Sequence, residues 1–276
     1  MRTFAVIVPA YNEAASIGAT LAALAAQTDT DFTLVIVDNA STDDTAAVVR
    51  GFAAPSGCPA GAQGCLHAAE TPLSTSQHRA PFPIEVVTET ERGAGTAADT
   101  GFRYAISNGA TLLARTDADC LPRTDWVATA RRYLTSGADL ACGRSVPRRD
   151  ERPSLAERHV FPAAVRLAAL YGRYRKAHRT PEFRTPYVLV HGHNLALTAD
   201  LYQRCGGTAR EPLEAGSEDV TLLNRARRHS ARIVRAEDLV VEASLRRLRA
   251  WGARRTLLWY WDRRWRPATP AEVHVR

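Results

Sequence analysis

Short apolar runs alternate with helical patterns in the first part of the chain. Residues 4–8 and 32–37 are apolar runs of strand length, and each is followed by a segment with helical character, at 16–26 and 45–49. Strand followed by helix, twice in succession, is typical of a parallel sheet, because the helix returns the chain to the same end of the sheet. We therefore predict an α/β fold with a mostly parallel sheet flanked by helices.

This pattern is interrupted once and then resumes. Residues 51–83 are rich in Pro, Gly and Ser and have no hydrophobic period, which predicts a mobile insertion rather than a domain boundary. Strand character returns at 84–87 and 111–115, with a helical segment at 97–107 between these two runs. The predicted sheet therefore continues beyond the insertion.

Composition narrows the class of protein. With 276 residues, 45% of them hydrophobic, the chain can bury a sizeable core without disulfides or metals. No apolar run approaches the roughly 18 residues of a membrane span, and the five cysteines are scattered, so we expect free thiols and a cytoplasmic location. Cys58 and Cys65 flank a loop, but no second Cys or His pair stands at zinc spacing, and their role stays open.

Charge is divided unevenly along the chain. Residues 1–143 carry 9 Arg against 15 acidic residues, a net of −6, whereas residues 144–276 carry 27 basic against 14 acidic residues, a net of +13. An acidic half suits divalent cations, and a basic half suits phosphates, anionic acceptors or a membrane surface.

Acidic residues follow two of the predicted strands. Asp38 ends the run at 32–37, and Asp117 and Asp119 come directly after the run at 111–115. Ligands of open α/β sheets bind outside the carboxyl ends of the strands, so these acids are expected to line one crevice. An Asp-x-Asp pair there can hold Mg²⁺ or Mn²⁺ together with the diphosphate of a nucleotide. Alternatively, the pair caps the helix that begins near residues 122–125.

Six short motifs occur in an order that resembles family 2 glycosyltransferases. They span roughly residues 4–225 and are VIVPAYNE at 6–13, VIVDNASTDDT at 35–45, RGAGTAADTG at 92–101, DAD at 117–119, GHNLA at 192–196 with Gly206-Gly207, and GSED at 216–219. The resemblance implies a nucleotide-sugar-dependent, inverting transferase with the Rossmann-like GT-A fold. It implies one glycosyltransferase domain at 1–230, with a nucleotide-binding half at 1–120 and an acceptor-binding half at 121–230. A basic aromatic extension with helical character follows at 231–276.

The resemblance also assigns the donor site. The donor is expected to be a UDP-, GDP- or dTDP-sugar, and the cofactor a divalent cation, Mg²⁺ or Mn²⁺. Pro9, Tyr11 and Glu13 are implied to surround the nucleotide, with Asp38 at the base. Asp117 is implied to meet the ribose and, together with Asp119, the metal and the diphosphate.

A carboxylate is also expected to act as the general base. Direct displacement at an anomeric carbon needs a group that takes the proton of the attacking hydroxyl, and the resemblance implies Glu218 and Asp219 for this role. We choose Asp219 over Glu218. Alternatively, both merely place negative charge at the N-terminus of a helix at 220–228.

Three positions depart from the family pattern. Asn39 stands where a second Asp is usual, and Cys120 follows Asp119 where another acid or a small polar residue is common. These differences leave the nucleotide base and the metal preference open. Asp99, within the motif at 92–101, either contacts the nucleotide or caps a helix.

Position in the family pattern suggests the acceptor site. Residues 185–190 are expected to form a sheet segment that walls the acceptor pocket, and Asn194 to hydrogen-bond a sugar hydroxyl. His191 and His193 alternate with Gly192 and point to one face of a strand. They are candidate metal or phosphate contacts, with His193 also a candidate acceptor contact, or else partly buried, hydrogen-bonded histidines.

The basic half suggests a further partner. Arginines stand among Tyr, Trp and Leu at 166–179 and 245–266, as in helices that lie on anionic membranes. Alternatively, these aromatic residues pack the helices onto the domain. We expect no binding of nucleic acid, because the acidic front half repels phosphate backbones and no RNA-binding motif is present.

The predicted function is glycosyl transfer with inversion to a hydroxyl of a glycan, a lipid-linked sugar or a small molecule. Such an enzyme belongs to polysaccharide or cell-envelope synthesis, in the cytoplasm or peripherally at the inner face of the membrane. One alternative is a nucleotidyltransferase, although the chain has a single lysine, Lys176, and no lysine-rich phosphate loop. The other is a protein that binds nucleotide-sugars and has lost turnover.

Overall fold

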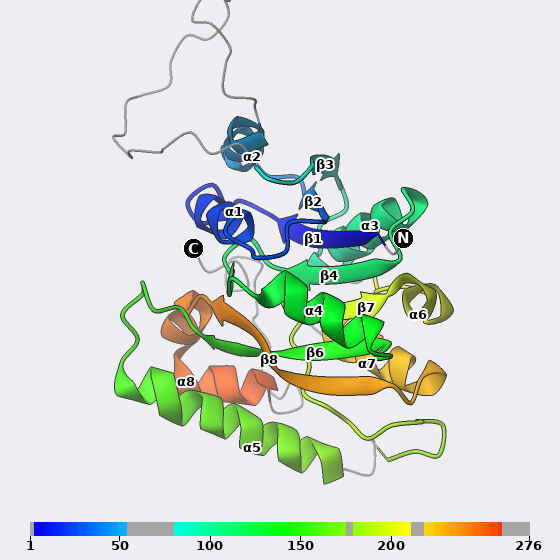
Figure 1. Ribbon diagram of the computed structural model, residues 1–276. Helices are drawn as coiled ribbons and strands as arrows, with labels where there is room; N and C mark the ends of the chain where they lie inside the picture. The colour runs from blue at the N-terminus through cyan, green and yellow to red at the C-terminus, as the bar shows by residue number, and fades with distance from the viewer. Residues whose placement is uncertain (1–2, 54–79, 175–178, 211–217, 261–276) are drawn as a thin grey trace, which may run out of the picture.

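The computed structural model describes residues 3–53, 80–174, 179–210 and 218–260. Within these residues one sheet of eight strands runs through the molecule in the order β3-β2-β1-β4-β7-β6-β8-β5 (Figure 1). Only β5 and β7 run antiparallel to their neighbours. The strands are β1 (Phe4–Ala10), β2 (Thr33–Asp38), β3 (Ile84–Thr88), β4 (Leu112–Thr116), β5 (Leu121–Pro122), β6 (Leu140–Pro147), β7 (Asn194–Thr198) and β8 (Ile233–Ala243). The expected α/β fold with a mostly parallel sheet is confirmed.

Alternate side chains of β1 enter two separate cores. Val6 and Val8 point to one face of the sheet, where α1 (Ile17–Ala25), α2 (Thr45–Ala53) and α4 (Trp126–Thr135) pack. Ala5 and Ile7 point to the other face, which is covered by the remaining sheet-packing helices, α3 (Ala94–Ser107), α6 (Ala199–Arg204) and α7 (Glu218–His229). Burial on both faces explains why the central strands are continuous apolar runs.

Two helices lie outside this sandwich. α5 (Phe161–Tyr174) follows a π-helical turn at Ala156–Val160, and α8 (Arg246–Tyr260) packs against it. The two occupy the lower part of the molecule, with α5 outermost (Figure 1). Gly252, with φ of 77°, kinks α8 in its middle, a conformation that glycine adopts without a side-chain clash.

The structure corrects two expectations about the second half of the sheet. Residues 185–190 form no strand; the sheet segment is β7, at Asn194–Thr198, between β4 and β6. The expected boundary at residue 230 also falls inside the sheet, because β8 pairs with β6 along Leu140–Pro147. The extension at 231–276 therefore begins with a strand of the main sheet, and only α8 continues as the basic helix.

Several expectations fall on residues outside those described. Most of the expected insertion at 51–83, together with Cys58 and Cys65, lies there, as do residues 261–266 of the aromatic segment. Cys120, Cys142 and Cys205 are described and are buried free thiols. No helix in the described ranges is both long enough and apolar enough to cross a membrane.

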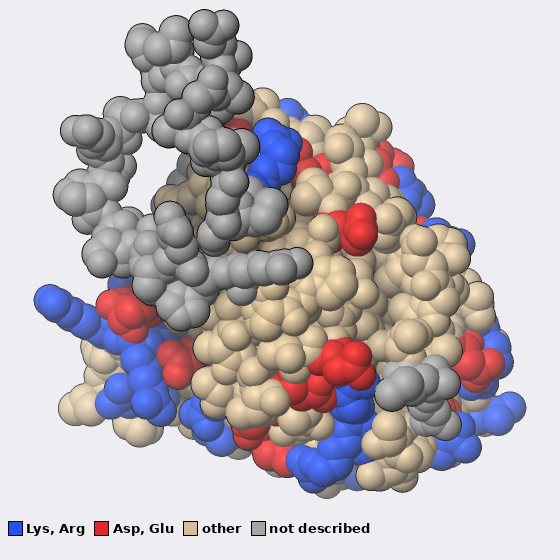
Figure 2. Space-filling view, turned by 45° about the horizontal axis from the view of Figure 1, so that its top comes forward, with Lys and Arg blue, Asp and Glu red and all other residues tan. Residues whose placement is uncertain are grey.

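Charged side chains are unevenly spread over the surface. In the space-filling view, the middle of the face shown is largely uncharged, and most of the basic side chains gather along its lower margin beside scattered acidic ones (Figure 2). The helical layer with α5 lies on this lower side of the molecule.

Candidate active site

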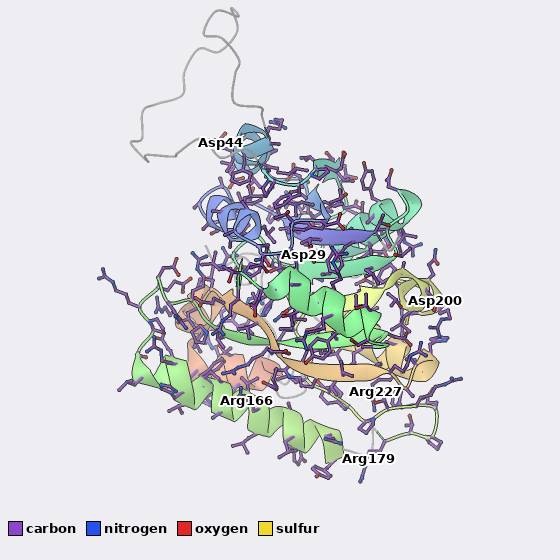
Figure 3. All side chains as sticks on the ribbon, viewed as in Figure 1. Asp29, Asp44, Arg166, Arg179, Asp200 and Arg227 are labelled. Atoms are coloured by element: carbon purple, nitrogen blue, oxygen red, sulfur yellow. The ribbon has the colours of Figure 1, made fainter. Side chains whose placement is uncertain are left out.

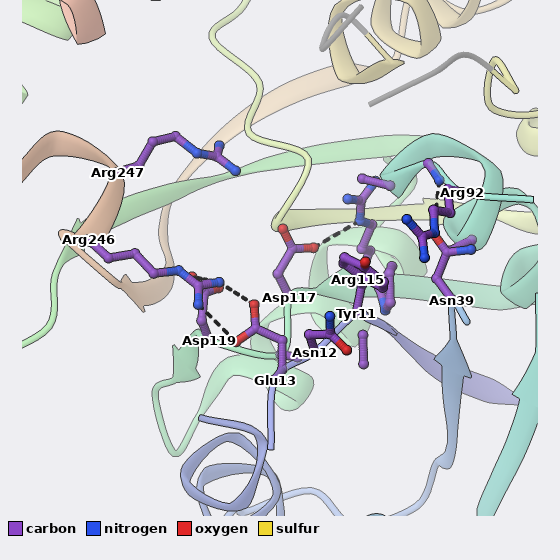
Figure 4. Close-up of a pocket in the computed structure, with 16 residues that line it drawn as sticks. Tyr11, Asn12, Glu13, Asn39, Arg92, Arg115, Asp117, Asp119, Arg246 and Arg247 are labelled. Carbon is purple, nitrogen blue, oxygen red and sulfur yellow. Dashed lines mark hydrogen bonds and ion pairs between the residues drawn. The ribbon is translucent and has the colours of Figure 1, made fainter. Parts of the chain in front are cut away.

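A pocket opens at the carboxyl ends of β1 and β4, beside the end of β2 (Figure 4). It brings together residues from five parts of the sequence: the end of β1 with the turn after it, Asn39 after β2, the segment 92–97, the end of β4 with the turn after it, and the start of α8. Its lining residues are Pro9, Ala10, Tyr11, Asn12, Glu13, Asn39, Arg92, Gly93, Ala94, Ala97, Arg115, Asp117, Ala118, Asp119, Arg246 and Arg247. Five of the predicted residues, namely Pro9, Tyr11, Glu13, Asp117 and Asp119, therefore share one pocket.

Arg246 joins two of these carboxylates. Its guanidinium Nη2 lies 3.0 Å from Oδ2 of Asp119, and its Nη1 donates to Oε2 of Glu13 at 3.0 Å. A second hydrogen bond connects Nη2 with Oε1 of Glu13. The first residue of α8 thus closes the pocket by contacting a loop that precedes it by 233 residues.

The pKa values of the two carboxyls respond to this arrangement in opposite directions. Burial raises the pKa of Glu13, and Arg246 offsets only part of the increase. Burial also works to raise the pKa of Asp119, but attraction by Arg246, Arg247 and His193 outweighs it and holds this pKa below its ordinary value. Asp119 is therefore ionised at neutral pH, as a ligand for a cation must be.

Arg115 connects the Asp-x-Asp turn to the first turn of α7. This fully buried residue of β4 donates from Nε to Oδ1 of Asp117 at 3.2 Å, and its Nη2 lies 3.9 Å from Oε1 of Glu218. A Cβ on Gly192 would lie 3.5 Å from both the Arg115 guanidinium and Cβ of Asp219. Glu218 and Asp219 are thus adjacent to the pocket, through Arg115, rather than among its lining residues.

Asn39 holds the segment that carries Arg92. Its amide donates to the carbonyl oxygens of Glu89 at 3.1 Å and Glu91 at 2.7 Å, and its Oδ1 accepts from the amide of Gly93 at 2.9 Å. The Arg92 guanidinium then lies over the Tyr11 ring, 5.2 Å from its centroid. An Asp cannot donate to the two carbonyl groups, which explains physically why Asn stands here.

A second pocket adjoins the first and shares four of its residues, Asp117, Asp119, Arg246 and Arg247. His193 lines it, with Nε2 3.0 Å from Oγ of Ser145, and stacks on His191 at 5.2 Å between ring centroids. Burial lowers the pKa of both histidines, so both are neutral at pH 7. His193 is therefore partly buried and hydrogen-bonded, and His191 is buried beside it.

The structure places Asp99 away from both pockets. Its side chain is 1% exposed in the middle of α3, where Oδ2 accepts from Arg103 at 2.8 Å and Oδ1 from the Tyr202 hydroxyl at 2.6 Å. Gly93, not Asp99, is the residue that precedes the helix. Neither the nucleotide contact nor the cap is thus present; Asp99 joins α3 to α6.

Asn194 also differs from the expected acceptor contact. It is fully buried, and its amide group is used within the protein. Its Nδ2 donates to the carbonyl oxygens of Arg144 and Leu239, each at 2.9 Å, and its Oδ1 accepts from Nε1 of Trp126 at 2.9 Å. With these bonds made, Asn194 joins β7, β6, β8 and α4 and has no amide hydrogen left for a sugar hydroxyl.

Asp38 ends β2 but does not line the described pocket. Its Oδ1 accepts from the backbone amide of Ser41 at 3.2 Å, so the carboxylate shapes the turn that follows the strand. Its neighbour Asn39 reaches the pocket instead.

The Asp-x-Asp turn offers the type of ligand, carboxylate oxygen, that a divalent cation such as Mg²⁺ prefers. Asp117 and Asp119 offer carboxylate oxygens at the pocket and are 35% and 19% exposed, respectively. Within the described residues, no group of three or more His, Cys, Asp or Glu side chains comes together to hold a metal. The donor set therefore fits a hard cation that completes its coordination on a diphosphate, and Asp119 must exchange its contact with Arg246 for it.

The sequence reasoning missed four arginines of the pocket: Arg92, Arg115, Arg246 and Arg247. Arg92 lay inside a recognised motif, and Arg115 precedes Asp117 by two residues. Arg246 and Arg247 belong to a basic segment that sequence alone assigned to a surface role. Nothing local in the sequence connects that segment with Glu13.

Comparisons with known proteins agree with this geometry. The family model described as glycosyl transferase family 2 matches residues 5–63 and 68–203. No curated protein sequence matches the chain significantly.

Solved structures share the fold at low sequence identity. A mannosyltransferase from Pyrobaculum calidifontis, in complex with GDP-Man and Mn²⁺, superposes with a TM-score of 0.61 at 23% identity, covering 100% of this chain and 69% of that chain. TarS 1-349 from S. aureus, in complex with UDP-GlcNAc, gives 0.54 at 16% identity, covering 88% of this chain and 58% of that chain. Glucosyl-3-phosphoglycerate synthase from Mycobacterium tuberculosis, in complex with phosphoglyceric acid, superposes with a TM-score of 0.52 at 18% identity, covering 95% of this chain and 80% of that chain.

The family model covers well over half of the chain, and the mixed sheet with its flanking helices is the GT-A architecture of these neighbours. This chain spans little more than half of the TarS fragment, and the likeness concerns the fold alone. The protein belongs to glycosyl transferase family 2.

Proposed function

We propose that this glycosyltransferase moves a sugar from a nucleoside diphosphate to an acceptor hydroxyl with inversion at the anomeric carbon. One observation carries the proposal: Tyr11, Glu13, Asp117 and Asp119 meet in one pocket at the carboxyl ends of β1 and β4. This is where open α/β sheets bind nucleotides. The donors that fit are UDP-, GDP- or dTDP-sugars, and the acceptor is a glycan, a lipid-linked sugar or a small molecule.

The diphosphate of the donor is assigned to the arginine side of the pocket. Arg92, Arg115 and Arg247 all line it, and guanidinium groups bind phosphate oxygens through paired hydrogen bonds. In our assignment, Tyr11 provides a flat face for the nucleoside and Glu13 and Asp117 accept hydrogen bonds from its hydroxyl groups. Asp38, which shapes the turn after β2, acts on the base only through that turn.

Asp119, together with Asp117, is proposed to hold Mg²⁺ or Mn²⁺. A divalent cation bound there would neutralise the negative charge that develops on the departing diphosphate. Arg246 is then released from Asp119 and keeps its hydrogen bonds with Glu13. The support for this assignment is the ionised state of Asp119 and the exposure of both carboxylates to the pocket.

The acceptor hydroxyl is assigned to the second pocket, beside His193. Its oxygen attacks the anomeric carbon, the bond from that carbon to the diphosphate oxygen breaks, and the proton passes to a carboxylate. We assign this role to Asp219, with Glu218 as the alternative, because both begin α7 next to Arg115. His193 is proposed to contact the acceptor from the wall of the same pocket.

A donor screen followed by two substitutions tests this function. Thermal shift with UDP-, GDP- and dTDP-sugars, with and without Mn²⁺, is expected to show a metal-dependent increase for one nucleotide, since a ligand stabilises the state that binds it. Asp219→Asn is expected to keep that shift and lose transfer, while Glu218→Gln keeps most transfer. Asp31→Asn, at a highly exposed aspartate, is the matched control.

The outcomes separate the candidate functions. No shift with any donor overturns the donor site. A normal shift without transfer in the wild type, across glycan, lipid-linked and small-molecule acceptors, indicates a binding protein that has lost turnover. Unchanged transfer in Asp219→Asn moves the base to Glu218 or elsewhere.

A further inference from the structure

The outer face of α5 is apolar. Leu167, Leu170, Tyr171 and Tyr174 are 67%, 51%, 55% and 62% exposed. Their spacings of three, four and seven residues place them on one side of the helix, which we call the outer face of α5. The opposite side, with Val165, is buried against the domain. A surface helix normally shows the reverse pattern, with polar residues toward the solvent.

Basic side chains border this face. Arg166 and Arg173 are exposed and stand seven residues apart on the same helix, so they lie in one row beside the apolar side chains. Arg166 is 3.7 Å from Glu237, a half-exposed residue of β8. In Figure 3, Arg166 and Arg179 lie along the lower side of the molecule, where α5 is outermost.

A pocket rich in arginine lies at the C-terminal end of α5. Among the described residues it is lined by Arg173, Tyr174, Arg179, Thr180, Phe183, Arg184, Thr185, Pro186 and Arg227, and no carboxylate is among them. Arg227 is 1% exposed and lies over the Phe183 ring at 4.0 Å, while its Nε donates to the carbonyl oxygen of Thr185. Glu182, the neighbouring acid, is paired with Arg228 at 2.8 Å. We call this the arginine pocket.

We propose that the outer face of α5 and the arginine pocket together bind the surface of an anionic phospholipid bilayer. The leucines and tyrosines enter the boundary between headgroups and acyl chains, and the exposed Arg173, Arg179 and Arg184 bind lipid phosphates. An apolar strip bordered by basic residues and continued by a basic pocket complements such a surface in both hydrophobicity and charge. A symmetric contact with a second copy matches less well, because it buries arginines of both copies without the carboxylates that would neutralise them.

The position of α5 connects this surface with the second pocket. Phe161, Pro162 and Val165 of the same helix line that pocket, next to His193 and Asp119. A protein held on a bilayer through α5 therefore keeps the pocket close to the lipid surface. This favours an acceptor hydroxyl carried by a lipid, a step that rests on the proposed function.

Flotation of the full chain with lipid vesicles tests the membrane surface. Binding is expected to vesicles of phosphatidylglycerol, to be absent with phosphatidylcholine, and to weaken as salt is added. The double variant Arg173→Gln/Arg179→Gln is expected to lower the partition coefficient about twenty-five-fold, at about fivefold for each arginine. Leu167→Gln/Leu170→Gln is expected to lower it at least about tenfold by removing inserted apolar area.

Matched controls stand outside the outer face of α5 and the arginine pocket. Arg50→Gln/Arg123→Gln removes the same charge from exposed positions, and Val86→Thr removes an exposed apolar group from β3. Both are expected to bind vesicles as the wild type does. Equal binding to the two lipids, or an equal loss in the arginine control, overturns the proposal. So does a dimer that Leu167→Gln/Leu170→Gln dissociates in the absence of vesicle binding.

A second readout separates this proposal from the donor site. The thermal shift with the nucleotide-sugar is measured without vesicles on each variant and is expected to match that of the wild type. A protein that binds the donor but not vesicles refutes the membrane surface alone. One that binds vesicles but no donor refutes the proposed function alone.

Discussion

Arginine is abundant both in the first pocket, which we call the donor pocket after its proposed role, and around α5, but its neighbours differ. In the donor pocket Arg246 contacts Glu13 and Asp119, and Arg115 contacts Asp117. In the arginine pocket, no carboxylate of the described residues lines the wall. Arg246 holds two protein carboxylates in position, whereas the exposed Arg173 and Arg179 lie in a pocket without a lining carboxylate and, in our proposal, bind an external anion. The net charge of +13 in residues 144–276 thus combines two different uses, that of Arg246 and that of the arginines in the arginine pocket.

Replacing Asp119, which pairs with Arg246 in the donor pocket, has the largest expected effect. Asp119→Asn is expected to lower transfer about a thousandfold, because the metal and the diphosphate lose their ionised ligand. Initial rates of transfer at saturating Mn²⁺ measure this. Asp31→Asn is the control for a lost carboxylate at an exposed site. Rates within about tenfold of the wild type would contradict the role of Asp119.

Replacing Arg246 tests its ion pairs with Glu13 and Asp119. Arg246→Gln leaves the buried Glu13 and Asp119 without their partner, so the free energy of unfolding is expected to fall by about 2 kcal/mol at pH 7. Burial already raises the pKa of Glu13, and this variant raises it further. An acid with a raised folded-state pKa destabilises the folded state more as pH rises, so the deficit is expected to narrow toward about pH 5.

Urea denaturation at both pH values measures this deficit, with Arg50→Gln as the control for a lost charge. Arg246→Lys keeps the charge and is expected to recover part of the stability. A deficit that is independent of pH would show that Glu13 does not depend on Arg246.

Asn39→Asp tests the hydrogen bonds by which the uncharged Asn39 amide holds the segment 89–93 beside the donor pocket. This change replaces a donor with a carboxylate that faces the carbonyl oxygens of Glu89 and Glu91, at a cost of about 2 kcal/mol in unfolding free energy. Asn108→Asp makes the same change at the exposed end of α3 and is expected to cost less than about 1 kcal/mol. Equal losses in the two variants, again measured with urea, would contradict the support role.

The smallest expected effect concerns pH and the histidines of the second pocket. Burial lowers the pKa of His191 well below its ordinary value, so below about pH 6.5 the unfolded chain takes up a proton that the folded protein refuses. Stability is therefore expected to fall with decreasing pH in this range, by up to about 1.4 kcal/mol per pH unit for this residue. His191→Gln is expected to show a shallower slope between pH values of about 7 and 5.5. An unchanged slope would exclude His191 as its source.

The first half of the fold could be predicted from sequence, because local patterns determine it. The strands at 4–8, 32–37, 84–87 and 111–115 are buried on both faces or lie next to such strands, and their apolar runs mark them clearly. The Asp-x-Asp turn was located for the same reason. It directly follows β4, and the carboxyl ends of parallel strands meet at one edge.

The second half was harder because its contacts join distant residues. The strand expected at 185–190 lies instead at 194–198, where β7 pairs antiparallel with both β4 and β6. Asn194 and Asp99 looked functional because they are polar residues in family motifs, but each uses its hydrogen bonds inside the fold. Arg246 acquires its role only through contact with Glu13, which no local pattern indicates.

The contact between Arg246 and Glu13 also determines when the donor pocket can form during synthesis. Strands β1 to β4, with Glu13 in the turn after β1 and Asp117 and Asp119 in the turn after β4, leave the ribosome long before β8 and α8. Until α8 has been made, Glu13 and Asp119 lack their shared partner Arg246. Until β8 has been made, β6 lacks one of its two neighbouring strands. Contacts between residues so far apart in sequence form late and slowly. The nascent chain thus assembles the acidic edge of the pocket first and completes the pocket only when α8 has been made.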